Sequence, residues 1–469
     1  MLNLIYVQPV LIVVIVEIRY SKSMNNAAID NLKQEALYTI DRNRDEIVKI
    51  GKSIFNEPEE GYREYKTAQK VKEEFEKLSI PCTGGYAITG IKGTIRCGSK
   101  GPRVALLGEL DAIINPEHPK ADRKTGAAHA CGHFAQIAWL LGGAIGLKAV
   151  ADSLTGSIAL LAVPAEEFIN MGFREDLRKR GEIQYFGGKQ EFIRLGLLDD
   201  IDIAIMNHAH SGEPVRSTHL IEGYNGFIGK SATFTGRASH AGAAPHLGIN
   251  ALSMFHVALS AINAQRETFK DTDASRVHFI ITKGGDSVNV VPSEVKVELF
   301  VRANRIETIQ KLSRKIDNAL KAGALGIGGS VEIRNIPGYM PLIPNRSLYS
   351  LWRRNADNIL GSENVISIPS IAASTDMGDI SHIIPSIEPS TGGFIGDLHS
   401  KDFTVVDEEM AYIIPAKLYA MTVIDLLKNG AGEAEEIIKN YNAPLIKKQY
   451  LNTLNSMFYT EKFSPDNCK

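Results

Sequence analysis

Three strongly apolar segments, each followed at once by acidic or histidine residues, constrain the possible folds of this chain more than any other feature. The segments and the polar residues that follow them are 104–108 with Glu109 and Asp111, 157–163 with Glu166 and Glu167, and 201–206 with His208 and His210. The run between the first two, residues 134–150, is rich in Ala, Leu and Gly and long enough for a buried helix. Strand, helix and strand in succession predict a doubly wound parallel sheet. Because ligands bind at the carboxyl ends of the strands in such sheets, we expect these polar residues to share one site.

The pentapeptide His129-Ala130-Cys131-Gly132-His133 directly precedes the predicted helix. Thiolate and imidazole groups are ligands that transition metals prefer. Taken alone, the pentapeptide fits a metal site and chance equally well, because Cys131 could be a small buried side chain. A structural zinc knuckle at Cys131 and His133 is a further alternative, and it would need four protein ligands and no open position.

Length and composition limit the class of protein. At 469 residues the chain exceeds the length at which a single core stops growing, so we expect two domains. A net charge of -2 without a basic block argues against nucleic acid as a partner. The cysteines lack the spacing of a disulfide framework, so we interpret them as reduced thiols of a cytoplasmic protein. They are Cys82, Cys97, Cys131 and Cys468.

Residues 2–16 are conspicuously apolar, but Gln8 and Pro9 interrupt them and the run is short for a bilayer. The segment also lacks the basic start and the small-residue cleavage site of a signal peptide. Met24 as the true initiator would explain it equally well. We therefore leave residues 1–23 out of the fold and expect no stable membrane insertion.

A second set of elements begins near Gly223. The patterns predict a strand at 227–235, a helix at 250–264, strands at 277–282 and 295–301, a helix at 306–325 and a strand at 331–336. This order resembles the split βαβ arrangement of ferredoxin-like domains. We therefore predict an inserted domain at 223–337 between two parts of the first domain, 24–222 and 338–469, with a closing helix at 410–427.

Several motifs in the same order resemble those of a known family. They are Gly108-Glu109-Leu110-Asp111-Ala112, the pentapeptide 129–133, Pro164-Ala165-Glu166-Glu167, His208, Gly236-Arg237-Ala238-Ser239-His240-Ala241, Gly284-Gly285 through Asn289 and Pro292, Ser374-Thr375-Asp376-Met377-Gly378, and Leu398-His399-Ser400. Together they resemble the co-catalytic metallopeptidases that include aminoacylases, glutamate-releasing carboxypeptidases, auxin-conjugate amidohydrolases and aminobenzoyl-glutamate hydrolases. The resemblance extends from about residue 32 to residue 427 and is most similar to the branch of aminobenzoyl-glutamate hydrolases and basic-dipeptide dipeptidases.

The resemblance implies an α/β fold, with a doubly wound catalytic domain and an inserted ferredoxin-like α+β lid or dimerisation domain. It implies a hydrolase that cleaves the amide bond of small N-acyl amino acids, aminobenzoyl-glutamate conjugates or dipeptides with a metal-activated water. The cofactor would be two divalent metal ions, zinc or manganese, with cobalt as a further candidate. A homodimer formed through the lid domain is also expected.

Carried over by position, the resemblance assigns the metal ligands as Cys131, His133, Glu167, His208 and His399, with Cys131 able to bridge the two ions. Glu166 would be the general base. His210 competes with His208 as a ligand, and the family position favours His208. Asp111 and His129 would lie beside the ligands and orient imidazoles.

Glu166 and Glu167 are adjacent, and adjacent side chains on a strand point to opposite faces. Both can serve one site only if Pro164 ends the strand and the backbone turns there.

The resemblance also implies a role for the lid, in which His240 hydrogen-bonds the oxyanion, across a dimer interface or after closure. Asn289 and Arg302 match positions that hold substrate carboxylate and carbonyl groups, although Arg302 could equally be a surface residue at a strand end. Ser374, Thr375 and Asp376 would line the pocket for the far end of the substrate. Asp376 would favour a cationic side chain there or would cap a helix.

A catalytically silent metal-binding subunit that regulates another chain is the alternative function. The presence of Glu166 argues against it, because a silent relative has no need of the base.

Overall fold

The three apolar segments form neighbouring parallel strands of one six-stranded sheet, as predicted. The computed structural model describes residues 31–465. The strand order is β1 (Cys82–Tyr86), β2 (Gly90–Arg96), β6 (Thr155–Val163), β3 (Ser99–Glu109), β7 (Ile203–Met206) and β15 (Ser386–Ile387). β3 lies in the centre, parallel to β6 on one side and to β7 on the other. The carboxyl ends of β3, β6, β7 and β15 therefore meet at one edge of this sheet.

Helices cover both faces of the sheet, because side chains along β3 alternate between two cores. Val104 and Leu106 face the helices of the first core, and Ala105 and Leu107 face the second. The helices of the first core are α2 (Asn31–Arg42), α3 (Arg44–Phe55), α4 (Tyr65–Lys77), α5 (His133–Val150), α10 (Arg346–Leu360), α12 (Ile414–Leu427) and α13 (Gly432–Asn440). Those of the second are α6 (Met171–Lys179), α7 (Gly188–Arg194) and α11 (Met377–Ser381).

A second sheet of five strands, which the sequence patterns did not indicate, lies beside the first. It consists of β14 (Val365–Ile368), β9 (Thr218–Ile221), β16 (Ser390–Ile395) and β17 (Thr404–Val405), with β8 (His208–Ser211) paired to β16. A short pair, β4 (Ile113–Ile114) and β5 (Ala127–Ala128), completes this part of the chain. β8 starts at His208, so this sheet fixes the backbone of a predicted ligand.

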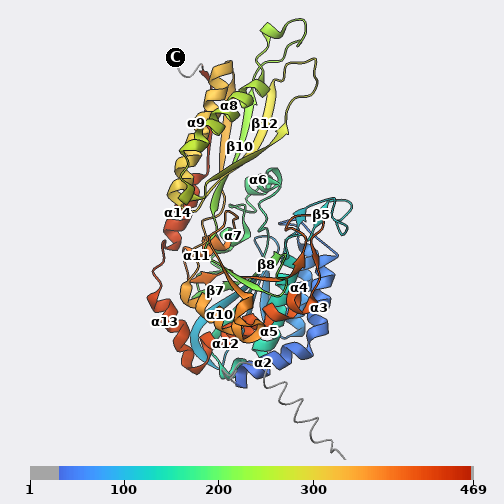
Figure 1. The fold of residues 1–469 in the computed structure, drawn as a ribbon, viewed down its shortest axis with the longest axis vertical. Coiled ribbons are helices and arrows are strands. Elements are labelled where there is room, and N and C mark those ends of the chain that lie inside the picture. The colour runs from blue at the N-terminus through green and yellow to red at the C-terminus, as the bar shows by residue number, and fades with distance from the viewer. Residues whose placement is uncertain (1–30, 466–469) are drawn as a thin grey trace, which may run out of the picture.

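The inserted segment folds as the predicted β-α-β-β-α-β unit and rises from one end of the molecule (Figure 1). Its elements are β10 (Gly226–Thr235), α8 (Ala251–Gln265), β11 (Arg276–Lys283), β12 (Glu294–Ala303), α9 (Ile306–Ile327) and β13 (Ser330–Pro337). The antiparallel order β11-β12-β10-β13 is that of a ferredoxin-like sheet, and α8 and α9 pack on one face.

The C-terminal segment departs from the prediction that residues 338–469 belong to the catalytic domain. After α14 (Lys447–Met457), strand β18 (Tyr459–Phe463) pairs antiparallel with β13 and becomes the fifth strand of the lid sheet. The strand is short and carries two charged residues, so its sequence gave no strand pattern. β18 forms because the edge of β13 offers backbone N–H and C=O groups with which a further strand can pair.

Two helical stretches, His133–Ser153 and Glu409–Leu427, are apolar and long enough to cross a membrane by length and composition. Both are mostly buried inside the protein, where core helices have the same composition, so they are weak evidence for a span. The second contains the predicted closing helix, which starts with a π-helical turn at Glu409–Ile413. The apolar segment 2–16, Met24 and Cys468 lie outside the described residues.

Candidate metal centre

The predicted ligand residues converge at the carboxyl edge of the first sheet. Two groups of ligand atoms, each within 4.8 Å of one another, share the Cys131 thiol: one adds His133 and His208, and the other adds Glu167 and His399. Sγ of Cys131 lies 3.6 Å from Nε2 of His208 and 3.3 Å from Nε2 of His399. Nε2 of His399 lies 3.1 Å from Oε1 of Glu167. Ligand atoms of a tetrahedral zinc ion, at bond lengths of about 2.0–2.3 Å, are separated by about 3.3–3.8 Å, and the three spacings lie within or just below this range.

Backbone carbonyl groups fix the tautomers of His133 and His208. Nδ1 of His133 lies 2.9 Å from the carbonyl oxygen of Asp111, and Nδ1 of His208 lies 2.8 Å from that of Ala209. A carbonyl oxygen only accepts, so each Nδ1 carries the proton and donates it. The Nε2 atoms therefore present lone pairs to the centre, the form that binds a metal.

Backbone conformation places the Cys131-Gly132-His133 turn and His399. Gly132 has a φ of 93° at the start of α5, and a Cβ there would lie 2.3 Å from Cβ of Ala209, so only glycine fits. His399 has a φ of 67°, and its backbone N–H donates to the carbonyl of Ala130 at 2.7 Å. The loop that carries His399 is thus tied directly to the pentapeptide.

A turn after Pro164 brings both glutamates to the site. β6 ends at Val163, and Ala165 has a φ of 55°, which reverses the alternation of the strand. The N–H of Ala165 donates to Glu64 at 2.8 Å, and the N–H of Glu167 donates to Oδ2 of Asp111 at 2.9 Å. This is the geometry that two adjacent glutamates need in order to serve one site.

Electrostatics favour a thiolate at Cys131 and a proton on Glu166. Burial and Glu167 oppose ionisation of Cys131, but the imidazoles of His208, His399 and His133 lower the pKa of the thiol to about 6. Burial, together with the charges of Glu109 and Glu167, raises the pKa of Glu166 well above its ordinary value. A carboxyl group that retains a proton readily is suited to general acid and base work.

The residues present fit a pair of divalent cations. Nε2 of His133 and Oε1 of Glu167 are completely buried and take part in no well-aligned hydrogen bond. Buried polar atoms are rarely left in this state, and cations between them would satisfy both. A thiolate, three imidazoles and carboxylates also form a donor set that suits zinc and admits manganese.

A cavity of about 460 Å³ opens on this centre and lies between the catalytic domain and the lid. Its polar lining comes mainly from the catalytic domain and includes Glu166, Ser374, Thr375 and Glu388. The lid contributes Phe227, Phe300 and Arg302. The side chain of Arg302 donates a hydrogen bond to Oγ of Ser374 at 2.7 Å, so the guanidinium faces the cavity and is not an exposed residue at a strand end.

Asp111 lies where the prediction placed it, because it orients His133 and holds the backbone of Glu167. His129 does not orient an imidazole: both of its ring nitrogens are buried without a hydrogen-bond partner, and its ring packs against Phe134.

His210 is turned away from the centre, since its ring stacks on His219 and its Nε2 lies 3.2 Å from the carbonyl of Ser217. Between His208 and His210, the structure brings only His208 to the centre.

Asp376 does not line the cavity, contrary to prediction. Its carboxylate is completely buried and forms an ion pair with Lys189, and its backbone position at the start of α11 carries no side-chain cap. Asp376 therefore neither binds substrate nor caps the helix. Its carboxylate is engaged by Lys189, which lies 187 positions away in the sequence, so no local pattern reveals this pairing.

His240 and Asn289 lie together on the lid, away from the cavity of their own chain. Both side chains are exposed, and the N–H of Ala241 donates to the carbonyl of Asn289 at 2.9 Å. Nδ1 of His240 accepts from the N–H groups of Gly242 and Ala243. Nε2 of His240 is the other ring nitrogen, and it is available for a hydrogen bond to a group outside this chain.

Sequence reasoning placed Glu109 at this edge of the sheet without a role, and it missed two further buried charged residues around the centre, Lys189 and Glu388. Glu109 lies 3.0 Å from Nε2 of His133 and forms a third possible ligand group with His133 and Glu166. Lys189 pairs with Glu109 and Asp376. Glu388 follows β15 and lines the cavity. The motif 108–112 was the available signal for Glu109, whereas the strand before Glu388 has only two residues and gives no pattern.

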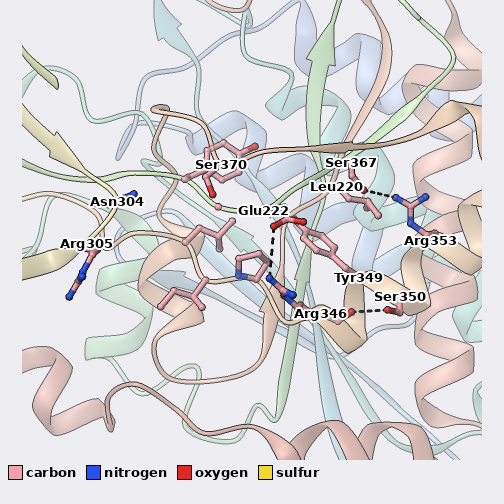
Figure 2. A pocket seen from close by; sticks show the side chains of 15 residues that line it. Leu220, Glu222, Asn304, Arg305, Arg346, Tyr349, Ser350, Arg353, Ser367 and Ser370 are labelled. Atoms are coloured by element: carbon pink, nitrogen blue, oxygen red, sulfur yellow. Dashed lines mark hydrogen bonds and ion pairs between the residues drawn. The ribbon is translucent and has the colours of Figure 1, made fainter. Parts of the chain in front are cut away.

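A second cavity, of about 450 Å³, lies where the chain crosses between the two domains (Figure 2). Its charged groups have partners of their own: Arg346 lies 4.0 Å from Glu222, and Arg353 donates to Ser367 at 2.7 Å. No potential metal-ligand group within residues 31–465 includes a side chain from this cavity. The first cavity is therefore the candidate site.

Comparison with known proteins shows which family this chain resembles. Residues 223–327 match the peptidase dimerisation domain of the M20 family. The chain is 27% identical to the Xaa-Arg dipeptidase of Mus musculus over 455 residues, which cover 91% of this chain and 96% of that protein. It is 25% identical to an IAA-amino acid hydrolase of Arabidopsis thaliana over 386 residues, 78% of this chain and 83% of that protein.

A solved structure from Bacillus subtilis, described as a dinuclear metal-binding peptidase of the M20 family, shares the fold. Its TM-score is 0.63 at 19% identity, and the match covers 82% of this chain and 99% of that one. The comparisons confirm the resemblance to the M20 family of peptidases and amidohydrolases that the motifs indicate.

Proposed function

We propose that this protein is a metal-dependent hydrolase of the amide bond in small N-acyl amino acids, aminobenzoyl-glutamate conjugates or dipeptides. The observation that carries the proposal is the position of Cys131 in two ligand groups at once, with Glu166 beside them in one cavity. The names of the relatives, a dipeptidase and an IAA-amino acid hydrolase, support the same bond type.

Cys131, His133, Glu167, His208 and His399 would hold two divalent cations, zinc or manganese and alternatively cobalt. When bound, such cations would lower the pKa of water to about 7 and so supply hydroxide at neutral pH. Glu166 takes the proton of the attacking water and gives it to the leaving amine. Arg302 holds the substrate carboxylate through its guanidinium group. Ser374, which accepts a hydrogen bond from Arg302, fixes the orientation of that group.

The exposed position of His240 leads us to propose a homodimer in which this residue serves the partner's cavity. β11 is an edge strand of the lid sheet and exposes Ile280 and Ile281, an apolar edge that a second copy could pair with. Mixing subunits of Glu166→Gln and His240→Ala tests the arrangement. If His240 acts in trans, the mixed dimers contain one complete site, and about a quarter of wild-type activity returns. Two inactive variants that stay inactive after mixing would contradict action in trans.

The activity itself is tested with the purified full chain and a panel of acyl amino acids, aminobenzoyl-glutamate and dipeptides. We expect hydrolysis that a chelator abolishes and that zinc, manganese or cobalt restores. Cys131→Ser should lose metal and activity, whereas Cys97→Ser, at a half-buried thiol of the sheet edge, should retain both. A metal-loaded chain that hydrolyses none of the panel would instead fit the silent regulatory subunit.

A further inference from the structure

The substrate cavity contains one basic and one acidic side chain outside the candidate ligand groups, Arg302 from the lid and Glu388 from the catalytic domain. The side chains of Arg302 and Glu388 form hydrogen bonds with consecutive residues of one loop. Arg302 donates to Oγ of Ser374 at 2.7 Å, and Oγ1 of Thr375 donates to Oε2 of Glu388 at 2.7 Å. Because neighbouring Cα atoms are about 3.8 Å apart, the guanidinium and the carboxylate flank the same short stretch of cavity wall.

Neither side chain has an ion-pair partner within the part of the chain that the structure describes. Among residues 31–465, Glu388 and Arg302 form no ion pair with each other or with any other side chain. Glu388 is only 1% exposed, and Nε of Arg302 is buried without a hydrogen-bond partner. A buried carboxylate is costly unless a cation or several donors compensate it. One hydroxyl donor from Thr375 compensates only part of that cost.

The backbone holds Glu388 rigidly in this place. β15 pairs parallel with β7 through Ser386 and Ala204, so the residue after β15 lies beside the end of β7, next to His208. The carbonyl of Glu388 accepts a hydrogen bond from the hydroxyl of Tyr349 at 3.1 Å. The carboxylate is therefore part of the fixed wall of the cavity.

We infer that Glu388 is a specificity residue that binds a positively charged nitrogen of the substrate. The inference rests on the proposed amide hydrolysis and narrows its substrate class. Arg302 would take the carboxylate at one end of the molecule, and Glu388 would take a cationic group at the other. The preferred substrates are then dipeptides with a free amino group or a basic side chain, and neutral N-acyl amino acids are poorer.

The test uses substrates that differ only in this charge. Alanyl-leucine carries a free ammonium group, and isobutyryl-leucine has a methyl group in its place. Isobutyryl-arginine carries its cation on the side chain of the leaving residue, so it separates the two sources of positive charge. Each is assayed with metal-loaded wild type, with Glu388→Gln and with Glu175→Gln, a buried carboxylate in a different cavity. Gln keeps an acceptor for Thr375, and metal content is measured for every variant.

We expect Glu388→Gln to raise KM about 10- to 100-fold for alanyl-leucine, for isobutyryl-arginine or for both, with little change in kcat. Isobutyryl-leucine should change less than about threefold, because it has no cation to lose. The substrate that responds identifies the source of the charge. Equal losses on all three substrates, or no loss on any, would overturn the inference. Absence of hydrolysis by wild type on every substrate would refute the proposed function instead, so the two failures are distinguishable.

Discussion

The ammonium nitrogen of Lys189 lies 2.5 Å from Oε1 of Glu109, and both side chains are completely buried. The same nitrogen also forms an ion pair with Asp376, so one cation is shared by two carboxylates. Although burial opposes its charge, Asp376 and Glu109 raise the pKa of Lys189 and keep it protonated. Lys189 thus links α7 to the end of β3 and to the start of α11, three elements that surround the candidate centre.

Replacing Lys189 should destabilise the fold strongly. Lys189→Met would leave Glu109 and Asp376 buried without their cation, which typically costs about 3–5 kcal/mol. Chemical denaturation should detect the loss, and adding Asp376→Asn should recover part of it. Lys92→Met, which removes a more exposed pair with Asp200, should cost less than about 1 kcal/mol. Equal stability of Lys189→Met and wild type would show that the network does not support the fold.

His208 and His210 should differ sharply in their effect on metal binding. His208→Ala removes an imidazole whose Nε2 lies 3.6 Å from Sγ of Cys131, so we expect about one metal ion fewer per chain. His210→Ala removes a ring that stacks on His219 and should leave the metal content unchanged. Mass spectrometry of the native proteins measures both. Loss with His210→Ala and retention with His208→Ala would reverse the assignment.

The lid should contribute a pH-dependent part of stability through Lys230. Its ammonium nitrogen lies 2.6 Å from Oδ1 of Asp317, and burial lowers the pKa of Lys230 from 10.5 to about 8. Between these two values the unfolded chain binds more protons than the folded chain, so stability rises with pH. The cost of burying the charge is therefore fully present below about pH 8 and is relieved as the pH approaches 10.5. A shift of this size corresponds to about 3 kcal/mol.

Denaturation curves between pH 7.5 and about 10.5 check this effect against the double variant Lys230→Met with Asp317→Asn. The variant has no buried ammonium group, so wild type should gain about 2–4 kcal/mol relative to it over that window. Tyr459, which donates to Asp317 in the wild type, keeps an acceptor in the variant. Parallel pH profiles of the two proteins would contradict the assigned titration.

Periodicity was sufficient to predict the main elements. β10 alternates buried and more exposed residues over its outer half, and α9 buries one face, including Ile309, Leu312, Ile316 and Leu320. Such patterns arise because one side of each element packs on a core, and they are visible in a single sequence. The strands β3, β6 and β7 are apolar on both faces and were recognisable as buried strands for that reason.

What sequence could not provide are the features that depend on distant partners. β15 has only two residues, too few for any pattern, yet it places Glu388 in the cavity. Asp376 resembles a helix cap or a pocket residue, and only the fold reveals Lys189 beside it. The ligand residues were accessible because their motifs follow strand ends, where the topology brings side chains together.

The C-terminal segment attaches the catalytic domain to the lid, and one hydroxyl in it should matter for stability. Oη of Tyr450 on α14 donates to Oδ1 of Asp379 at 2.8 Å, and both side chains are completely buried. The other oxygen of Asp379 already lacks a hydrogen-bond partner, and burial raises the pKa of this carboxyl group well above its ordinary value. Removing the hydroxyl would therefore leave this carboxyl group without the side-chain donor that α14 supplies.

We expect Tyr450→Phe to lower the free energy of unfolding by about 1–3 kcal/mol, the cost of leaving a buried polar group unsatisfied. Tyr441→Phe is the matched control, because its hydroxyl donates to the carbonyl of Ser381 at a partly exposed position. Water can replace that donor, so the control should lose less than about 1 kcal/mol. Both values come from denaturation of the full chain. Equal losses for the two variants would mean that α14 docks through its apolar side chains and not through the Tyr450–Asp379 hydrogen bond.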